Sequence, residues 1–192
     1  LDAYGTGAKP VLQFANTGGL FFGTQDWRVA NLDLLGPGAS GDPAIECMAH
    51  VTTGNITVWN TSFRSWSGTP VAWANWGTVI QNPHFGHVIA GCDFSGGNGP
   101  MFIGGRQQAI IGNRMENNTP VSHIVRVWQM HKGVINHNIM RDPSPTRHAL
   151  KLHGPSDAGP DRLGQVGRTE FVTITDNVFR GGDWAVAIGP QN

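Results

Sequence analysis

Basic and aromatic side chains recur in two segments of this chain that align without a gap, residues 123–128 (HIVRVW) and residues 148–153 (HALKLH). The segments lie 25 residues apart, and Arg126 aligns with Lys151. Guanidinium and ammonium groups bind carboxylates, and aromatic faces stack on sugar rings. These residue types therefore predict an acidic carbohydrate as ligand. The alternative is an ordinary solvated face that carries scattered cations and aromatics.

A β-strand would position these side chains, because its successive residues point to opposite faces. The valines and leucines of both segments share one phase, which we expect to point inward. The opposite phase would face solvent, and neighbouring segments extend it. Its predicted members are Trp73, Phe102, Arg126, Trp128, Lys151 and His153. We interpret His123 and His148 as histidines at the start of a strand that bond to backbone.

Arg126 and Lys151 would lie one strand apart, at about 5 Å. Two like charges at this distance repel by roughly 1 kcal/mol in water. A bound anion or a nearby carboxylate would offset the repulsion, and long side chains can also splay apart. Residues 154–169 form a long insertion next to this pair, and insertions of such length are often functional. The connections also supply two further cations to the predicted site, Arg147 and Arg162.

Short segments rich in Val and Ile are separated by Gly, Asn, Asp and Pro, which are strand and turn signals. Two strand types alternate, one like residues 123–128 and one like residues 134–140, which carries Asn near its end. The alternation gives about six turns of roughly 20 to 40 residues, which predicts a solenoid. We expect a ladder of hydrogen-bonded side chains at Asn113, Asn138 and Asn177, incomplete where Cys92 takes the place.

With these repeats the chain resembles the right-handed parallel β-helix proteins, the pectate-lyase-like superfamily that also includes alginate lyases and phage tailspikes. The segment LDAYGTGAKPVL at residues 1–12 is similar to one that often precedes the coils of secreted members. The resemblance spans nearly the whole chain and implies an all-β fold, a right-handed parallel β-helix solenoid of about six coils. It also implies a secreted or cell-surface protein, with residues 1–192 as one domain of a longer chain that lacks its N-terminal cap.

The resemblance implies the chemistry of a polysaccharide lyase, which cleaves a uronic-acid glycan by β-elimination. The reaction needs a group that neutralises the carboxylate, a base for the α-proton and an acid for the leaving oxygen. By resemblance, Lys151 is the base, Arg126 grips the carboxylate and His153 is an alternative base. Related enzymes often use Ca²⁺, although no strand here offers the clustered Asp and Glu that such an ion needs. The expected substrate-binding residues are Trp73, Phe102, Trp128, Arg147 and Arg162.

Two alternatives stay open. A glycoside hydrolase would need paired carboxylates about 5 to 10 Å apart, and Glu46 is the one acidic residue that we expect to face outward on a strand of the first type. A non-catalytic carbohydrate-binding or structural protein of an extracellular fibre or surface assembly would associate end to end, as solenoids without polar caps do.

The chain of 192 residues carries 13 basic and 13 acidic residues, so its formal net charge is zero. This balance argues against a nucleic-acid partner, and no apolar run is long enough for insertion into a membrane. The eight histidines show no zinc motif, and we expect His84 and His87 at the surface of a loop. Cys47 and Cys92 are expected to be buried and unpaired.

Overall fold

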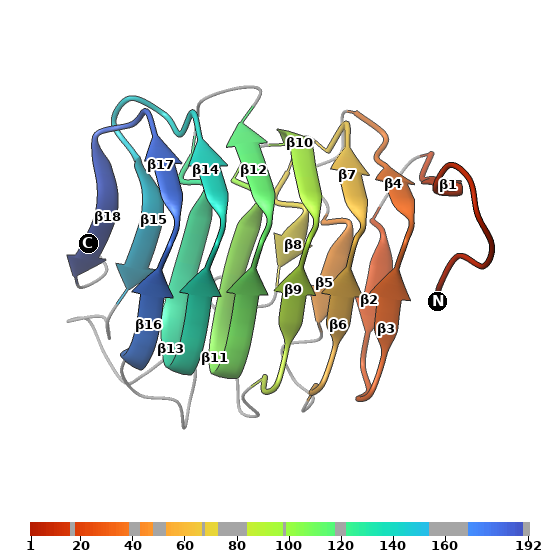
Figure 1. Cartoon of the computed structure of the whole chain (residues 1–192), viewed down its shortest axis with the longest axis horizontal. Coiled ribbons are helices and arrows are strands. Elements are labelled where there is room, and N and C mark those ends of the chain that lie inside the picture. Colours follow the sequence, from red (N-terminus) through yellow and green to blue (C-terminus); the bar gives the residue numbers. More distant parts are fainter. Residues whose placement is uncertain are drawn as a thin grey trace.

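In the part of the chain that the structure describes, the regular secondary structure is all β-strand. The computed structural model describes residues 1–15, 18–38, 43–47, 53–66, 68–72, 84–97, 99–117, 122–153 and 169–189. In these ranges there is no helix long and apolar enough to cross a bilayer. The strands form two sheets, of seven and eleven strands, and every strand pair is parallel (Figure 1).

Neighbouring strands of one sheet lie apart in the sequence. The seven-stranded sheet has the order β1 (Val11–Gln13), β4 (Asp33–Leu35), β7 (Ser62–Arg64), β10 (Asp93–Gly97), β12 (Arg114–Asn117), β14 (Ile139–Arg141) and β17 (Val178–Arg180). The main path of the eleven-stranded sheet is β2 (Leu20–Phe22), β5 (Ile45–Cys47), β8 (Val71–Ala72), β11 (Met101–Ile111), β13 (Val125–Asn136), β15 (His148–His153) and β18 (Trp184–Gly189). Four further strands pair beside this path: β3 (Arg28–Ala30), β6 (Thr57–Trp59), β9 (Val88–Ala90) and β16 (Glu170–Thr175).

The core is built by the inward phase of these strands. Val, Ile, Leu and Met from both sheets form one cluster of buried side chains, as expected for strands that alternate apolar and polar residues. Phe63 and Phe94 stack within it with ring centroids 4.4 Å apart. Cys47 and Cys92 are buried and free, which confirms the prediction. The layers follow the sequence from one end of the molecule to the other, so the two termini lie at opposite ends (Figure 1).

The structure corrects the fold prediction. The all-β class and the parallel strands agree with it, but the strands build two parallel sheets rather than the single solenoid of about six coils of a right-handed parallel β-helix. The second strand type is also not one continuous strand. β13 ends at Asn136 and β14 begins at Ile139, with His137 at φ 54° between them, and the two strands belong to different sheets. The second strand type is thus divided by a residue in the left-handed region, which bends the chain.

The predicted asparagine ladder is present directly after His137 and the equivalent positive-φ residues Gly112 and Asp176. Oδ1 of Asn138 accepts from the backbone N–H and from Nδ2 of Asn113, at 3.0 and 2.9 Å. Oδ1 of Asn177 accepts in the same way from Asn138, at 3.0 and 2.9 Å. Cys92 joins the ladder only through its backbone N–H, which donates to Oδ1 of Asn113 at 2.9 Å. The ladder satisfies buried polar groups at the bend and helps to fix the register of the layers.

Candidate functional site: a basic cluster on β13 and β15

The parallel register brings the three predicted catalytic residues together. Arg126 of β13 lies opposite Lys151 of β15, and Trp128 lies opposite His153. Phe102 of β11 lies on the other side of Arg126. The offset of 25 residues in the sequence is therefore the pairing register of the two strands. We refer to these five residues as the basic cluster.

Three side chains of the basic cluster are buried rather than exposed. Phe102, Trp128 and His153 are 5%, 3% and 4% exposed, whereas Arg126 and Lys151 are half-buried. The rings of Trp128 and His153 stack with centroids 5.6 Å apart, and Phe102 meets Trp128 edge to face at 6.0 Å. The expectation that the whole outward phase faces solvent is therefore wrong, because these rings pack against one another.

The guanidinium of Arg126 is held by two of these rings. Its Nε donates to Nε2 of His153 at 2.9 Å, and its central carbon lies 5.6 Å from the centroid of Phe102. Burial, with a contribution from Arg147, lowers the pKa of Arg126 to about 10. Burial, followed by the charges of Arg126 and Lys151, lowers the pKa of His153 to about 3. The imidazole is therefore neutral near pH 7 and already uses its Nε2 lone pair, which argues against His153 as the base.

Lys151 carries its ammonium toward the next strand. The backbone of Lys151 lies opposite Ala187 of β18. A Cβ added to Gly189 would lie 3.7 Å from Nζ of Lys151. The side chain therefore extends over small residues of β18, on the opposite side from β13, as splaying of like charges predicts. Its role as a base stays a prediction.

Two histidines and a second arginine lie at the start of these strands. Nδ1 of His123 accepts from the backbone N–H of His148 at 3.0 Å, which confirms the backbone-bonded interpretation for His123. The two rings lie 5.0 Å apart. Burial and then the charge of Arg126 lower the pKa of His123 to about 4, and burial and then Lys151 lower the pKa of His148. Arg147 is exposed and acts on the same group of residues through its charge.

Part of the predicted site cannot be placed. Trp73 and Arg162 lie outside the described residues, as do residues 154–168 of the long insertion. The register sets Ala72 opposite Phe102. Glu46 lies in the same row, next to Ala72, and is half-buried. It is the one carboxylate in the described part of the row, which gives the paired carboxylates of a glycoside hydrolase no support.

Calcium binding has no support from the described side chains. Among them, no three His, Cys, Asp or Glu residues lie close enough together to hold a metal ion. Ca²⁺ takes six to eight oxygen ligands, usually with several carboxylates. The residues of the basic cluster do not fit this ion, and no step proposed below involves it.

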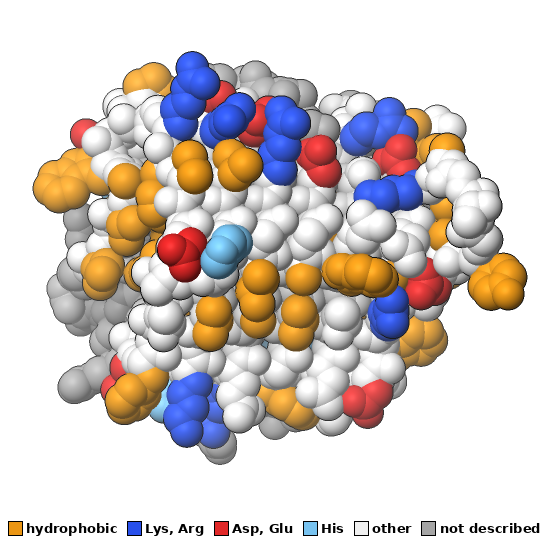
Figure 2. Space-filling view, in the orientation of Figure 1, with side chains coloured by type: hydrophobic (Ala, Val, Ile, Leu, Met, Phe, Trp, Pro, Cys, Tyr) orange, Lys and Arg blue, Asp and Glu red, His pale blue; other side chains and the backbone are white. Residues whose placement is uncertain are grey.

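A second group of cations lies on the outer face of the seven-stranded sheet (Figure 2). Arg114 and Arg141 both approach Oε1 of Glu116, at 2.9 and 3.6 Å, and Arg64 pairs with Asp33. Arg64 and Arg114 are exposed, and their carboxylate partners are partly buried. Because carboxylates of the same sheet already balance them, this group is a weaker candidate for binding an anion.

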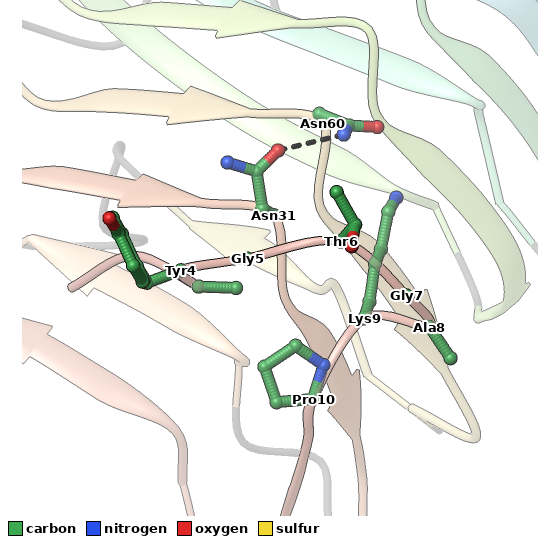
Figure 3. Close-up of a pocket in the computed structure, with 10 residues that line it drawn as sticks. Tyr4, Gly5, Thr6, Gly7, Ala8, Lys9, Pro10, Asn31 and Asn60 are labelled. Carbon is green, nitrogen blue, oxygen red and sulfur yellow. Dashed lines mark hydrogen bonds between the residues drawn. The ribbon is translucent and has the colours of Figure 1, made fainter.

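A hollow of about 510 Å³ opens beside the N-terminal segment and is lined by residues 3–10 with Asn31 and Asn60 (Figure 3). Nδ2 of Asn60 donates to Oδ1 of Asn31 at 2.8 Å, and Nδ2 of Asn31 donates to Asp2 at 2.7 Å. The amides thus bond to one another across the layers. Lys9 is the one cation among the residues that line the hollow. The basic cluster is therefore the stronger candidate for binding an acidic ligand.

The sequence interpretation missed a buried polar group in the core. His84 and His87 are 1% and 0% exposed, so their predicted surface position is wrong. Thr53 bonds to Nδ1 of His84, and Nδ1 of His87 accepts from the backbone N–H of Ile56 at 3.2 Å. Burial lowers the pKa of His84 to about 4 and that of His87 to about 3. The apolar residues around His87 in GHVIA are the one signal that could have indicated its burial.

Comparisons of the chain with family models, with curated proteins and with solved structures found no match. The function must therefore be argued from the site alone.

Proposed function

We propose that this protein binds an acidic polysaccharide at the basic cluster, with a uronate carboxylate held by Arg126 and with Lys151 beside it. The observation that carries the proposal is the register pair of these two cations on adjacent strands. The charged neighbours that lower the pKa of His153 are all basic. A bound carboxylate would lie in this positive potential and offset the repulsion between the cations.

The same geometry supports β-elimination as the reaction. Arg126 would neutralise the uronate carboxylate and thereby acidify the α-hydrogen. Lys151, in its neutral form, would take this proton from C5. The C5–H pair of electrons then forms the C4–C5 double bond and the C4–O bond breaks. The leaving oxygen takes one proton from water or from the ammonium of Lys151. His153 keeps its hydrogen bond to Arg126 throughout.

A non-catalytic role in an extracellular assembly is the second candidate, and exposed apolar residues at one end of the molecule favour it. Phe171, Trp184 and Ile188, on the C-terminal strands β16 and β18, are 71%, 62% and 75% exposed. Large exposed apolar residues that cluster mark interaction sites. End-to-end self-association would cover them.

Incubation with a panel of uronic-acid polysaccharides, followed by ultraviolet absorbance of the unsaturated product, tests the proposed reaction. We expect a rise with at least one polymer and none with neutral dextran. A flat trace with every polymer, together with retained binding, would support the non-catalytic role. A flat trace without binding would contradict the proposed function.

A further inference from the structure

The hydrogen bond between Arg126 and His153 specifies which ring nitrogen carries a proton. Arginine is only a donor, so Nε2 of His153 must present a lone pair to the N–H of Arg126. A neutral imidazole then carries its proton on Nδ1. This nitrogen is buried and has no hydrogen-bond partner among the described residues. The ring is thus a neutral acceptor, held in one tautomer by Arg126.

The ring that accepts this bond is itself immobilised. It is 4% exposed and stacks on Trp128 with an interplanar angle of 28°. Thr169 donates to the backbone carbonyl of His153 at 2.6 Å and accepts from the backbone N–H of Met130 at 3.2 Å, which ties the end of β15 to β13. A ring that is packed and tied in this way gives a defined position to the group bonded to it.

We propose that His153 is a positioning residue, which fixes Arg126 through Nε so that the two Nη groups meet a carboxylate side by side. The inference rests on the proposed function, because it concerns the ligand of the same site. It changes the role that the sequence implied for His153, from a base to a neutral acceptor. A planar carboxylate suits this end-on contact, since two parallel N–H···O bonds need a guanidinium of fixed plane.

Protonation of His153 would break the arrangement. An imidazolium has no lone pair and would place a second positive charge 2.9 Å from Nε of Arg126. Lys151 adds a further positive charge nearby. The arrangement therefore requires that the ring stay neutral through the pH range in which an ordinary histidine titrates.

The tautomer can be read directly from the ¹⁵N chemical shifts of the His153 ring in the ¹⁵N-labelled full chain without ligand. We expect the Nδ1–H tautomer with no titration from pH 8 to pH 5. A ring protonated on Nε2, or one that titrates near its ordinary pKa, would overturn the inference. This result does not depend on whether any polysaccharide binds.

Binding of a polygalacturonate oligomer by substituted chains tests the positioning role. We expect His153→Phe, which keeps a stacked ring but removes the acceptor, to weaken binding about tenfold. His153→Gln, whose amide oxygen can accept from Nε, should recover part of this loss. Arg126→Met should abolish the effect of His153→Phe, because one residue acts through the other. Arg180→Ala, on the outer face of the other sheet, is the matched control.

The outcomes separate the two proposals. If the unsubstituted chain binds no polyuronate, the proposed function fails, while the tautomer still decides whether His153 holds Arg126. If the chain binds and His153→Phe binds equally well, with the same thermal midpoint, the positioning role is wrong and the proposed function stands. If the losses from His153→Phe and Arg126→Met simply add, His153 has only a structural effect, which also overturns the inference.

Discussion

The two sheets carry two groups of cations in opposite settings. On the seven-stranded sheet, Arg114 is exposed and Arg141 is half-buried, and both share Glu116 as their partner. On β13 and β15, Arg126 and Lys151 are half-buried, and Arg126 donates through Nε to a neutral imidazole. Exposed ion pairs contribute little to stability and are screened by salt. Arg126 is instead a partly desolvated cation that is oriented by a neutral group, and this difference makes the basic cluster the proposed site.

The largest effect that this contrast predicts is on turnover. Lys151→Met should lower the rate of product formation about 1,000-fold, because a general base typically contributes 100- to 10,000-fold. Lys132→Met, at an exposed position of β13, should change the rate by less than about twofold. The ultraviolet assay measures both variants. A comparable loss of rate in both variants would show that the basic cluster does not differ from the rest of the surface.

Acid sensitivity should follow from the buried histidines. The pKa of His84 is about 4 in the folded chain and 6.5 when unperturbed, so the unfolded chain binds more protons between these values. Stability from this group is complete above pH 6.5 and is lost as the pH falls toward 4. The loss from His84 alone is about 3 kcal/mol at pH 4.

Urea unfolding at pH 7 and pH 4.5 measures this slope. His84→Gln should make the free energy of unfolding less dependent on pH, and His137→Gln, at an exposed position, should not. If the free energy of unfolding of the unsubstituted chain stays constant from pH 7 to pH 4.5, burial does not lower the pKa of these imidazoles.

Ligand affinity should distinguish the two groups of cations. Arg126→Met removes charge-assisted hydrogen bonds to the carboxylate and should weaken polygalacturonate binding about thirtyfold. Arg114→Met removes an equal charge from the other sheet and should change the affinity less than about twofold. Calorimetric titration at fixed salt compares them. Equal losses would indicate non-specific attraction of a polyanion to the whole surface.

The smallest effect is expected at the ion pairs of the seven-stranded sheet. Glu116→Gln breaks the contacts to Arg114 and Arg141, and it should change the free energy of unfolding by less than about 1 kcal/mol. Urea unfolding measures this change. If the free energy of unfolding falls by several kcal/mol, these ion pairs stabilise the sheet, which would contradict the difference between the two groups of cations.

The sequence was most informative where two strands share a repeat. The alignment of residues 123–128 with residues 148–153 predicted that Arg126 lies beside Lys151, and the asparagines predicted the ladder. Both depend only on spacing along the chain, because register between parallel strands repeats the spacing of the sequence.

Features that depend on packing could not be predicted in this way. Trp128 and His153 were expected at the surface, yet they are buried, because contacts between side chains of neighbouring strands decide their exposure. The division of the second strand type at His137 depends on one backbone angle, and histidine is not a typical turn residue. The burial of His84 and His87 likewise depends on neighbours that are distant in sequence.

In the proposed function Arg126 holds a uronate carboxylate and Lys151 lies beside it. NMR titration of the full chain with a short polygalacturonate oligomer, following the Arg126 Nε–H and Lys151 ammonium signals, tests it most directly. Binding at the basic cluster should give saturable shifts of both signals at the same oligomer concentration, with the Arg114 Nε–H signal unchanged. Shifts that are absent from Arg126 and Lys151, or that appear equally on Arg114, would contradict it.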